Sequence, residues 1–289
     1  MARRKPASIH GLAVIDKPVG VTSHDVVGMV RRHLNERRVG HAGTLDPDAT
    51  GVLLVGVGNA TRLLRFLTAL GKTYTADVVF GTETSTLDAS GDITATHQMA
   101  AVTLDQARSV IAAHLVGPIF QVPPMVSALK VDGRRLYELA REGIEIERVP
   151  RPVTVHRFDV TSTPDPMVLR IEVVCSSGTY VRTLAADLGR LLGGGAHLRN
   201  LRRTACGSFD QSQATSVEQL VLLTPAQALR DYQQVQVDVQ TAVMVRNGRA
   251  LPEWPGPGPW AVCTEVGDLL AVYERDGERA RPAVVLALF

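Results

Sequence analysis

The chain has 289 residues, of which 45% are hydrophobic and 21% are charged, as is typical of a globular protein with one large domain or a large and a small one. Its three cysteines lie far apart without CxxC spacing, which argues against a structural zinc site or a disulfide framework and fits a reducing compartment. It contains neither the apolar run of a signal peptide nor the ~18 apolar residues of a membrane span, so we expect a soluble, cytoplasmic protein.

The first part of the chain alternates apolar strand patterns with helical ones. Ser23 is the expected N-cap of a helix whose apolar residues recur at helical spacing as far as Leu34. Alternation of apolar and polar residues over 72–81 predicts a half-buried strand. The other elements expected here are a short strand at 12–16, a buried strand at 52–57, a helix from about 59 to 70 and a helix from 103 to 115.

The middle of the chain changes character at about 117–152, where prolines cluster around a short helical piece. We interpret this segment as an insertion packed on the main body. Strand patterns resume at 153–160 and 169–175, and a helix follows at 180–192, where three glycines end it.

Near residue 230 the composition changes to short β-like runs separated by proline and glycine, which indicates a small β domain. We therefore divide the chain into a body of residues 1–232 and a small domain of residues 233–289. The chain has no GxGxxG after a strand and no GxxxxGK[ST], so nucleotide-cofactor folds lose support. Because strands and helices alternate irregularly, the body is predicted to be α+β with an antiparallel sheet.

The most informative segment is 40–51, which reads Gly-His-Ala-Gly-Thr-Leu-Asp-Pro-Asp-Ala-Thr-Gly and precedes the buried strand. Glycines let the backbone turn tightly or lie close to a ligand. Pro47 restricts Asp46 to extended backbone, so the carboxylate is expected to project from a fixed turn at the mouth of the strand. A structural turn aspartate is the alternative, because ordinary loops also contain Gly and Asp.

Two other segments carry residues that suit a site with this carboxylate. Tyr74 lies on the apolar face of its strand, as a core residue or as the wall of a site. Tyr180 and Arg182 stand at a helix start. An arginine beside Asp46 would keep that carboxylate ionised by lowering its pKa, whereas the alternative for Arg182 is a surface ion pair of small effect.

Basic residues are concentrated in two places. Arg199, Arg202 and Arg203 have no acid near them in sequence, and we interpret them as a grip for phosphates. Residues 1–65 contain ten Lys/Arg against five Asp/Glu, which favours a polyanionic partner over a merely solvated surface.

The motifs taken together resemble, in order and spacing, the bacterial TruB family of tRNA pseudouridine synthases, over about residues 9–210. The segments that carry the resemblance are 40–51, Lys72-Thr73-Tyr74, Ser127-Ala128-Leu129-Lys130, 178–182 and 195–203. The resemblance implies isomerisation of uridine 55 in the TΨC loop of tRNA. It also implies a mixed, mainly antiparallel sheet flanked by helices and loops, followed by a PUA-like β domain in the tail.

The resemblance also assigns roles to residues. Asp46 is the catalytic aspartate, Tyr74 lies against the target base and Arg182 pairs with Asp46. Expected substrate-binding residues are the pocket-lining Tyr180 and Leu201, the loop-wedging His41, and Lys17, Asp88, Lys130 and Arg202. Segment 117–152 corresponds to an RNA-clasping insertion. Asp48 departs from the motif, which often has an uncharged residue there, and its charge tends to raise the pKa of Asp46.

The implied reaction sets further expectations. Because pseudouridine is an isomer of uridine, the reaction needs no redox cofactor, ATP or metal. We expect the T arm of tRNA as the partner, a flipped target nucleotide, no membrane association, no obligatory protein partner and a monomer.

Two other functions are compatible with parts of the sequence. A retaining glycoside hydrolase would use Asp46 and Asp48 as its carboxylates, ~5–5.5 Å apart across a sugar. The arginine clusters and the few aromatic residues, 4% of the chain, disfavour this alternative. A non-catalytic RNA-binding or tRNA-folding protein would use the basic face and the tail alone. This second role is compatible with catalysis in the same chain.

Overall fold

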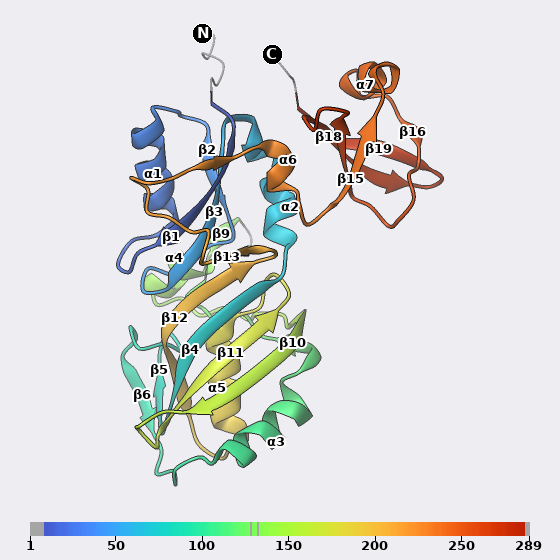
Figure 1. Ribbon diagram of the computed structural model, residues 1–289. Coiled ribbons are helices and arrows are strands. Elements are labelled where there is room, and N and C mark those ends of the chain that lie inside the picture. The colour runs from blue at the N-terminus through green and yellow to red at the C-terminus, as the bar shows by residue number, and fades with distance from the viewer. Residues whose placement is uncertain (1–8, 128, 132, 287–289) are drawn as a thin grey trace.

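The structure, a computed structural model, describes residues 9–127, 129–131 and 133–286. A mixed sheet forms the centre of the larger domain, and helices α3 (Leu104–His114) and α5 (Val181–Leu191) lie against one of its faces (Figure 1). In spatial order its strands are β14 (Leu222–Leu223), β1 (Gly11–Lys17), β3 (Thr50–Val57), β12 (Ala196–Cys206), β4 (Lys72–Phe80), β11 (Val168–Cys175), β10 (Arg151–Ser162) and β7 (Gly117–Gln121).

Two short strands extend this sheet, since β2 (Val39–Ala42) pairs with β3 and β13 (Phe209–Asp210) pairs with β12. Within the described residues the pairing of β12 with β3 is parallel and the other pairings of this sheet are antiparallel. The predicted α+β fold with a mixed, mainly antiparallel sheet is therefore confirmed. No helix in the described ranges is both long and apolar enough to cross a membrane.

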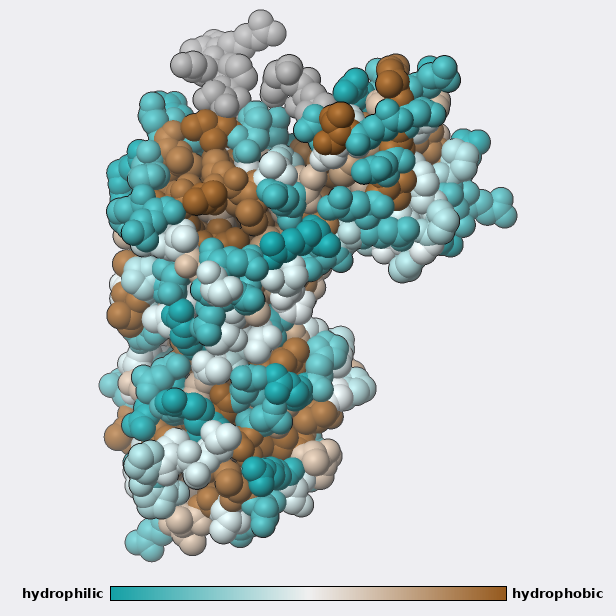
Figure 2. Space-filling model, in the orientation of Figure 1, coloured by the Kyte–Doolittle hydropathy of each residue, from teal (hydrophilic) through white to brown (hydrophobic). Residues whose placement is uncertain are grey.

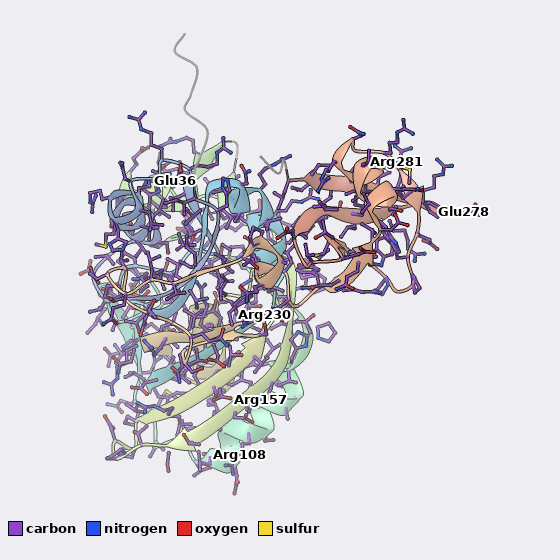
Figure 3. All side chains as sticks on the ribbon, turned by 45° about the horizontal axis from the view of Figure 1, so that its top comes forward. Glu36, Arg108, Arg157, Arg230, Glu278 and Arg281 are labelled. Atoms are coloured by element: carbon purple, nitrogen blue, oxygen red, sulfur yellow. The ribbon has the colours of Figure 1, made fainter. Side chains whose placement is uncertain are left out.

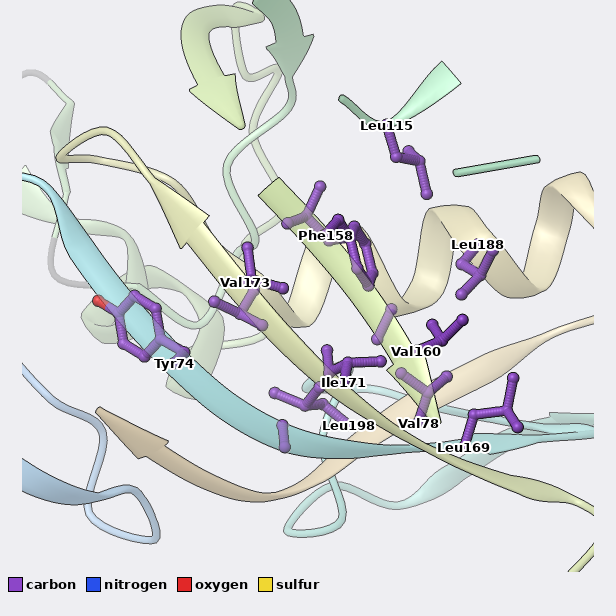
Figure 4. Packing of buried hydrophobic residues seen from close by; sticks show 14 of the residues in the cluster. Tyr74, Val78, Leu115, Phe158, Val160, Leu169, Ile171, Val173, Leu188 and Leu198 are labelled. Atoms are coloured by element: carbon purple, nitrogen blue, oxygen red, sulfur yellow. The ribbon is translucent and has the colours of Figure 1, made fainter. Parts of the chain in front are cut away.

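The burial pattern of each strand follows what covers its two faces. In β1 all positions from Gly11 to Ile15 are buried, because clusters pack on both sides of the strand. In β4 the residues Tyr74, Ala76, Val78 and Phe80 face the core formed with α3 and α5 (Figure 4). The opposite face of this part of the sheet carries polar side chains, such as Arg157 of β10 (Figure 3), which pairs with Asp159 at 2.5 Å.

The helix α1 (Ser23–Leu34) begins one residue earlier than its predicted cap implies. Thr22, not Ser23, is the N-cap, and it forms a capping box with Asp25. Ser23 is buried instead, and its hydroxyl binds the backbone of Leu45. The prediction was wrong because two hydroxyl residues stand in sequence and local pattern does not tell which one faces the loop.

The proline-rich insertion is shorter than predicted. Its first residues form β7, an edge strand paired with β10, so segment 117–121 belongs to the central sheet. The segment that leaves the sheet is 122–150. It contains the short helix α4 (Leu136–Arg141) and the small hairpin of β8 (Lys130–Val131) and β9 (Arg134–Arg135).

Short elements complete the larger domain: the 3-10 helix η1 (Gly58–Leu63), α2 (Leu64–Ala69), α6 (Pro225–Ala228), β5 (Thr82–Thr84) and β6 (Ile93–Thr96). The C-terminal part is a separate sheet in the order β15 (Gln233–Val237), β17 (Trp260–Thr264), β18 (Leu269–Asp276), β19 (Arg279–Val285) and β16 (Leu251–Pro252), with α7 (Val239–Arg246) beside it.

The C-terminal sheet docks on the larger domain through α2. Tyr232 donates its hydroxyl to the backbone oxygen of Phe66 at 2.8 Å, and Arg65 pairs with Glu274 at 2.7 Å. One apolar cluster contains residues of both sheets. Below this contact the surface is hollowed between the C-terminal part and the lower end of the central sheet (Figure 2). The C-terminal domain therefore rests on the end of the larger domain at which α2 lies.

Candidate active site

A cavity of about 270 Å³ opens where the Gly43–Asp46 turn, β4 and the start of α5 meet. It contains three of the predicted catalytic residues and two of the predicted pocket residues. The lining residues with chemically active or pocket-forming side chains are Asp46, Lys72, Tyr74, Ser127, Tyr180, Arg182, Leu201 and Arg203.

The ion pair of Asp46 and Arg182 forms one wall of the cavity. Nη2 of Arg182 lies 3.1 Å from Oδ2 of Asp46, and the arginine side chain is only 5% exposed. The same guanidinium pairs with Asp88 at 3.2 Å and donates to the backbone oxygens of Thr86 and Val126, both at 2.9 Å. Four acceptors therefore fix its position, and it holds the Asp46 carboxylate at the cavity wall.

The surroundings of Asp46 raise the pKa of its carboxyl above the ordinary value. Burial is the largest cause, and the positive charge of Arg182 opposes it. Asp88 adds to the rise, Lys17 opposes it, and Asp48 adds the smallest contribution. The expected effect of Asp48 thus has the predicted sign, but burial outweighs it.

Lys17 binds the turn that carries Asp46 through hydrogen bonds to its backbone. This side chain is buried, and its ammonium group donates to the backbone oxygens of Pro18, Val21 and Pro47 at 2.9, 2.6 and 3.0 Å. Burial lowers the pKa of Lys17 to about 8. Lys17 therefore fixes the residue after Asp46 rather than lining the cavity.

Tyr74 stands at the edge of the core, with its hydroxyl directed away from the apolar cluster (Figure 4). Burial raises the pKa of the phenol to about 12, while the charge of Arg203 and a hydrogen bond with it oppose this rise. The hydroxyl is therefore protonated at neutral pH. The ring lines the cavity and can cover one face of a flat ligand.

Gln121 is a functional candidate that the sequence did not reveal. Its side chain is buried, and it exchanges two hydrogen bonds with the backbone of Tyr180 directly before α5. The side chain of Tyr180, the N-cap residue of α5, forms no cap hydrogen bond itself. A glutamine in a proline-rich stretch gives no sequence signal for this contact, because its partner is 59 positions away.

Comparison with known families identifies the chain. A family model described as "TruB family pseudouridylate synthase (N terminal domain)" matches residues 31–181, and two models of C-terminal domains of tRNA pseudouridine synthases match residues 182–235 and 232–287. The chain is 43% identical over 300 residues to the tRNA pseudouridine synthase B of Arthrobacter sp. (strain FB24), with 96% of this chain and 97% of that protein covered. The chain belongs to the TruB family of pseudouridylate synthases.

Another TruB relative, the tRNA pseudouridine synthase B of Symbiobacterium thermophilum, is 49% identical over 259 residues, with 86% of each chain covered. The fold also resembles a chain in a crystal structure of a Cbf5–Nop10–Gar1 complex, with a TM-score of 0.73, 24% identity, and coverage of 96% of this chain and 84% of that one. As a TruB-family pseudouridylate synthase the protein is an isomerase, and its predicted family is confirmed.

Four of the residues expected from the TruB resemblance do not line the cavity in the described part of the structure: Lys17, Asp88, His41 and Arg202. His41 lies half-buried in β2, and burial lowers the pKa of its imidazole, followed by the charges of Arg203 and His24. The imidazole is thus neutral at neutral pH. Lys130 lies in β8, and its side chain is outside the described part of the structure.

Arg202 lies close to an acid in space, although no acid stands near the arginines of 199–203 in sequence. Its guanidinium forms two hydrogen bonds with Asp16 at 3.0 and 2.8 Å, and Arg199 lies 3.7 Å from Asp77. Arg202 lines a second cavity, of about 440 Å³, together with Asp48. The sheet brings these acids close from distant positions in sequence, which is why local sequence did not reveal them.

Proposed function

We propose that this TruB protein isomerises uridine 55 in the T arm of tRNA to pseudouridine, with Asp46 as the catalytic carboxylate and the target nucleotide flipped into the cavity. The observation that carries the proposal is the 3.1 Å pair of Asp46 and Arg182 at the cavity wall beside the Tyr74 ring. The names of the TruB relatives, tRNA pseudouridine synthase B, support tRNA as the substrate.

The reaction breaks the bond between C1′ and N1 of the uracil and forms a bond between C1′ and C5, after which the C5 proton leaves and N1 takes up a proton. No electrons are gained or lost overall. The Asp46 carboxylate acts on C6, on C1′ or on a ribose proton, and each of these roles requires it to be ionised. Arg182 favours that ionised form and fixes its direction, in opposition to the desolvation that favours the neutral acid.

The cavity also suits a flipped pyrimidine. Tyr74 offers an aromatic face for the base, and such stacking is worth about 1–3 kcal/mol per base. Extrusion of a nucleotide from a stacked loop costs a few kcal/mol, which the stack and the contacts of the enzyme with the loop offset. Tyr180 and Leu201 close the cavity around the base.

The test is incubation of the protein with an unmodified tRNA transcript, followed by nucleoside analysis. The expected result is one product nucleoside with the mass of uridine and the retention of pseudouridine, at position 55. Asp46→Asn should abolish it while tRNA binding persists.

Asp48→Asn is the matched control, because Asp48 lies two residues away and lines the other cavity. It should keep most of the activity. Near-normal turnover by Asp46→Asn would remove Asp46 from the mechanism. Binding of tRNA by the wild-type protein without any product would instead favour an RNA-binding or tRNA-folding protein, and release of free base or sugar would favour a hydrolase.

A further inference from the structure

Two buried cations in the cavity wall have no part in the chemistry described so far. Lys72 of β4 and Arg203 of β12 line the cavity, and they are 5% and 1% exposed. The register of these strands sets Arg203 opposite Tyr74 and Cys206 opposite Lys72. A Cβ atom on Gly43 would lie 3.4 Å from Nη1 of Arg203 and 3.8 Å from Cε of Lys72, so the two side chains meet beneath this glycine.

Neither cation is paired with an acid. Among the ion pairs of the described residues, those near the cavity join Arg182 and Arg202 to carboxylates, and none includes Lys72 or Arg203. Lys72 donates to the backbone oxygen of Leu70 at 2.6 Å and to that of Thr68. Arg203 donates to the backbone oxygens of Val52 and Gly43 at 2.7 and 3.1 Å. These carbonyls fix the charges without neutralising them.

Among the described residues, the charged side chains that line the cavity are therefore one acid and three bases. Asp46 faces Arg182, and Arg182 is also shared with Asp88. Lys72 and Arg203 leave an excess of positive charge in a place that water scarcely reaches. Burial of a charge without a counter-ion is costly, so a site of this kind favours an anion that enters the cavity.

The proposed reaction produces such an anion, a negatively charged pyrimidine, whether Asp46 acts on C6, on C1′ or on a ribose proton. When the C1′–N1 bond breaks, its electron pair stays on N1 of the pyrimidine and is delocalised onto O2 and O4. When a carboxylate adds to C6 instead, the electron pair of the C5–C6 double bond moves toward O4. In both cases negative charge develops on the base. Formation of the C1′–C5 bond, loss of the C5 proton and uptake of a proton by N1 complete the isomerisation, and where the carboxylate has added to C6 its bond to C6 breaks again.

We propose that Lys72 and Arg203 stabilise this negative charge on the pyrimidine of the target uridine, and that they keep the detached base in the cavity. The inference rests on the proposed function and adds two catalytic residues to it. Fixed charges directed at the place where charge develops are among the largest sources of catalysis. A backbone phosphate of the RNA is the less suitable occupant, because Lys72 and Arg203 line the cavity and are almost completely buried, whereas phosphates lie on the outside of the RNA.

The first test uses Lys72→Met and Lys72→Arg, with saturating unmodified tRNA and single-turnover conditions. We expect the rate of Lys72→Met to fall about 10²-fold, the Kd for tRNA to change by less than about threefold, and Lys72→Arg to recover most of the rate. Arg31→Met is the matched control, because Arg31 is half-buried and donates to the backbone oxygen of Val39, away from the cavity. It should keep the wild-type rate.

The second test is the pH dependence of the wild-type rate, compared with that of Lys72→Met. Burial lowers the pKa of Lys72 to about 8; Arg203 lowers it further, and Cys206 and Cys175 oppose these effects. The positive charge is lost as the pH rises through this value. The wild-type single-turnover rate should therefore fall above about pH 8, and this decline should be absent from any folded Lys72→Met protein.

Three results would overturn the inference. A wild-type rate in Lys72→Met would show that the charge is not used. Weaker tRNA binding with a full rate and a shallower salt dependence would assign the cations to phosphates. Equal rate losses in Lys72→Met and Lys72→Arg, together with a lower unfolding temperature, would leave Lys72 as a structural cap of α2. If the wild-type protein forms no pseudouridine, the proposed function fails instead.

Discussion

The side chain of Gln121 and the backbone of Tyr180 exchange two hydrogen bonds. The Tyr180 N–H donates to Oε1 at 3.0 Å, and Nε2 donates to the Tyr180 oxygen at 3.3 Å. Gln121 is the last residue of β7, where the insertion begins, and Tyr180 is the last residue before α5. The amide therefore joins the base of the insertion to the helix that carries Arg182.

Gln121→Glu should destabilise the protein and displace the start of α5. The substitution keeps the size of the side chain but places a second acceptor against the Tyr180 oxygen. A buried acceptor without a donor costs about 1–3 kcal/mol, which urea unfolding can measure. We expect the rate at saturating tRNA to fall as well, because Arg182 follows Tyr180 by two residues. An unchanged rate in a destabilised Gln121→Glu protein would show that the contact supports the fold alone.

Arg182→Lys should keep the charge and lose the geometry. The guanidinium serves two carboxylates and two backbone oxygens, whereas an ammonium group is a point charge that cannot reach all four. We expect a loss of single-turnover rate of at least about 10²-fold, as for removal of one group that stabilises a transition state.

Arg182→Met is the comparison for Arg182→Lys. It leaves Asp46 and Asp88 without their cation, which destabilises the fold. Because the Asp46 side chain is 41% exposed, water screens its charge and the cost stays below the roughly 3–5 kcal/mol of a fully buried pair. Arg182→Lys should therefore be the more stable of the two, and both should be nearly inactive. High activity in Arg182→Lys would mean that charge alone suffices.

At neutral pH the ionised Asp46 carboxylate should lower the free energy of unfolding of the protein. Burial raises the pKa of its carboxyl above the value of 3.8 for an unperturbed aspartate, so the folded state binds the proton more tightly than the unfolded state. The contribution of the Asp46 carboxyl to the free energy of unfolding therefore decreases as the pH rises from the pKa of the unfolded state through the raised pKa of the folded state. We predict that Asp46→Asn is at least as stable as the wild type at pH 7 and lacks this dependence on pH. A clear loss of stability in thermal unfolding at pH 7 would contradict the prediction.

The acid limb of the rate should depend on the same carboxyl. Because each role proposed for Asp46 requires the ionised form, activity should fall as the pH falls through its raised pKa. Removal of the Asp48 charge should shift that limb slightly toward lower pH, since Asp48 raises the pKa of Asp46. The measurement is the single-turnover rate of the wild type and of Asp48→Asn between pH 4 and 8. A shift in the opposite direction would contradict it.

The family and the residues of the ion pair were predictable from sequence, because the segment 40–51 and the start of α5 retain their local patterns. Asp46, Tyr74 and Arg182 accordingly line one cavity. The α+β sheet was predictable from the alternation in β4 and the continuous apolar run of β1. The order of apolar and polar residues along a strand reflects which of its faces are buried. It predicts these two strands well because they are buried along most of their length.

The remaining features depend on partners that are distant in sequence. The acid that pairs with Arg202 is 186 positions away, and the carbonyl that accepts from Arg203 at 2.7 Å is 151 positions away. The local pattern at 199–203 therefore showed the arginines but not the partners that the sheet brings to them. The edge strand β7 was hidden by its proline, Pro118, which an edge position tolerates because one side of the strand needs no ladder bonds.

The bulge in β12 provides the last prediction. Asn200 has a left-handed backbone with φ 56° and lies inside the first register shift of β12 against β4, between Arg199 and Arg202. The next residue, Leu201, lines the cavity. The side-chain amide of Asn200 donates to Oδ2 of the buried Asp77 at 2.8 Å. Although burial raises the pKa of Asp77, hydrogen bonds from Asn200 and Arg170 lower it overall, so this contact stabilises the fold above the unfolded pKa and is lost in acid.

Asn200→Gly and Asn200→Ala both remove the bond to Asp77, so their comparison isolates the backbone. Glycine adopts a positive φ freely, whereas alanine pays about 1–2 kcal/mol for it. We expect Asn200→Ala to be less stable than Asn200→Gly by about 1 kcal/mol in urea unfolding, and to have the lower kcat/KM because the bulge sets the direction of Leu201. Equal stability of the two proteins would mean that the bulge relaxes without Asn200, and that Leu201 is placed by its own packing.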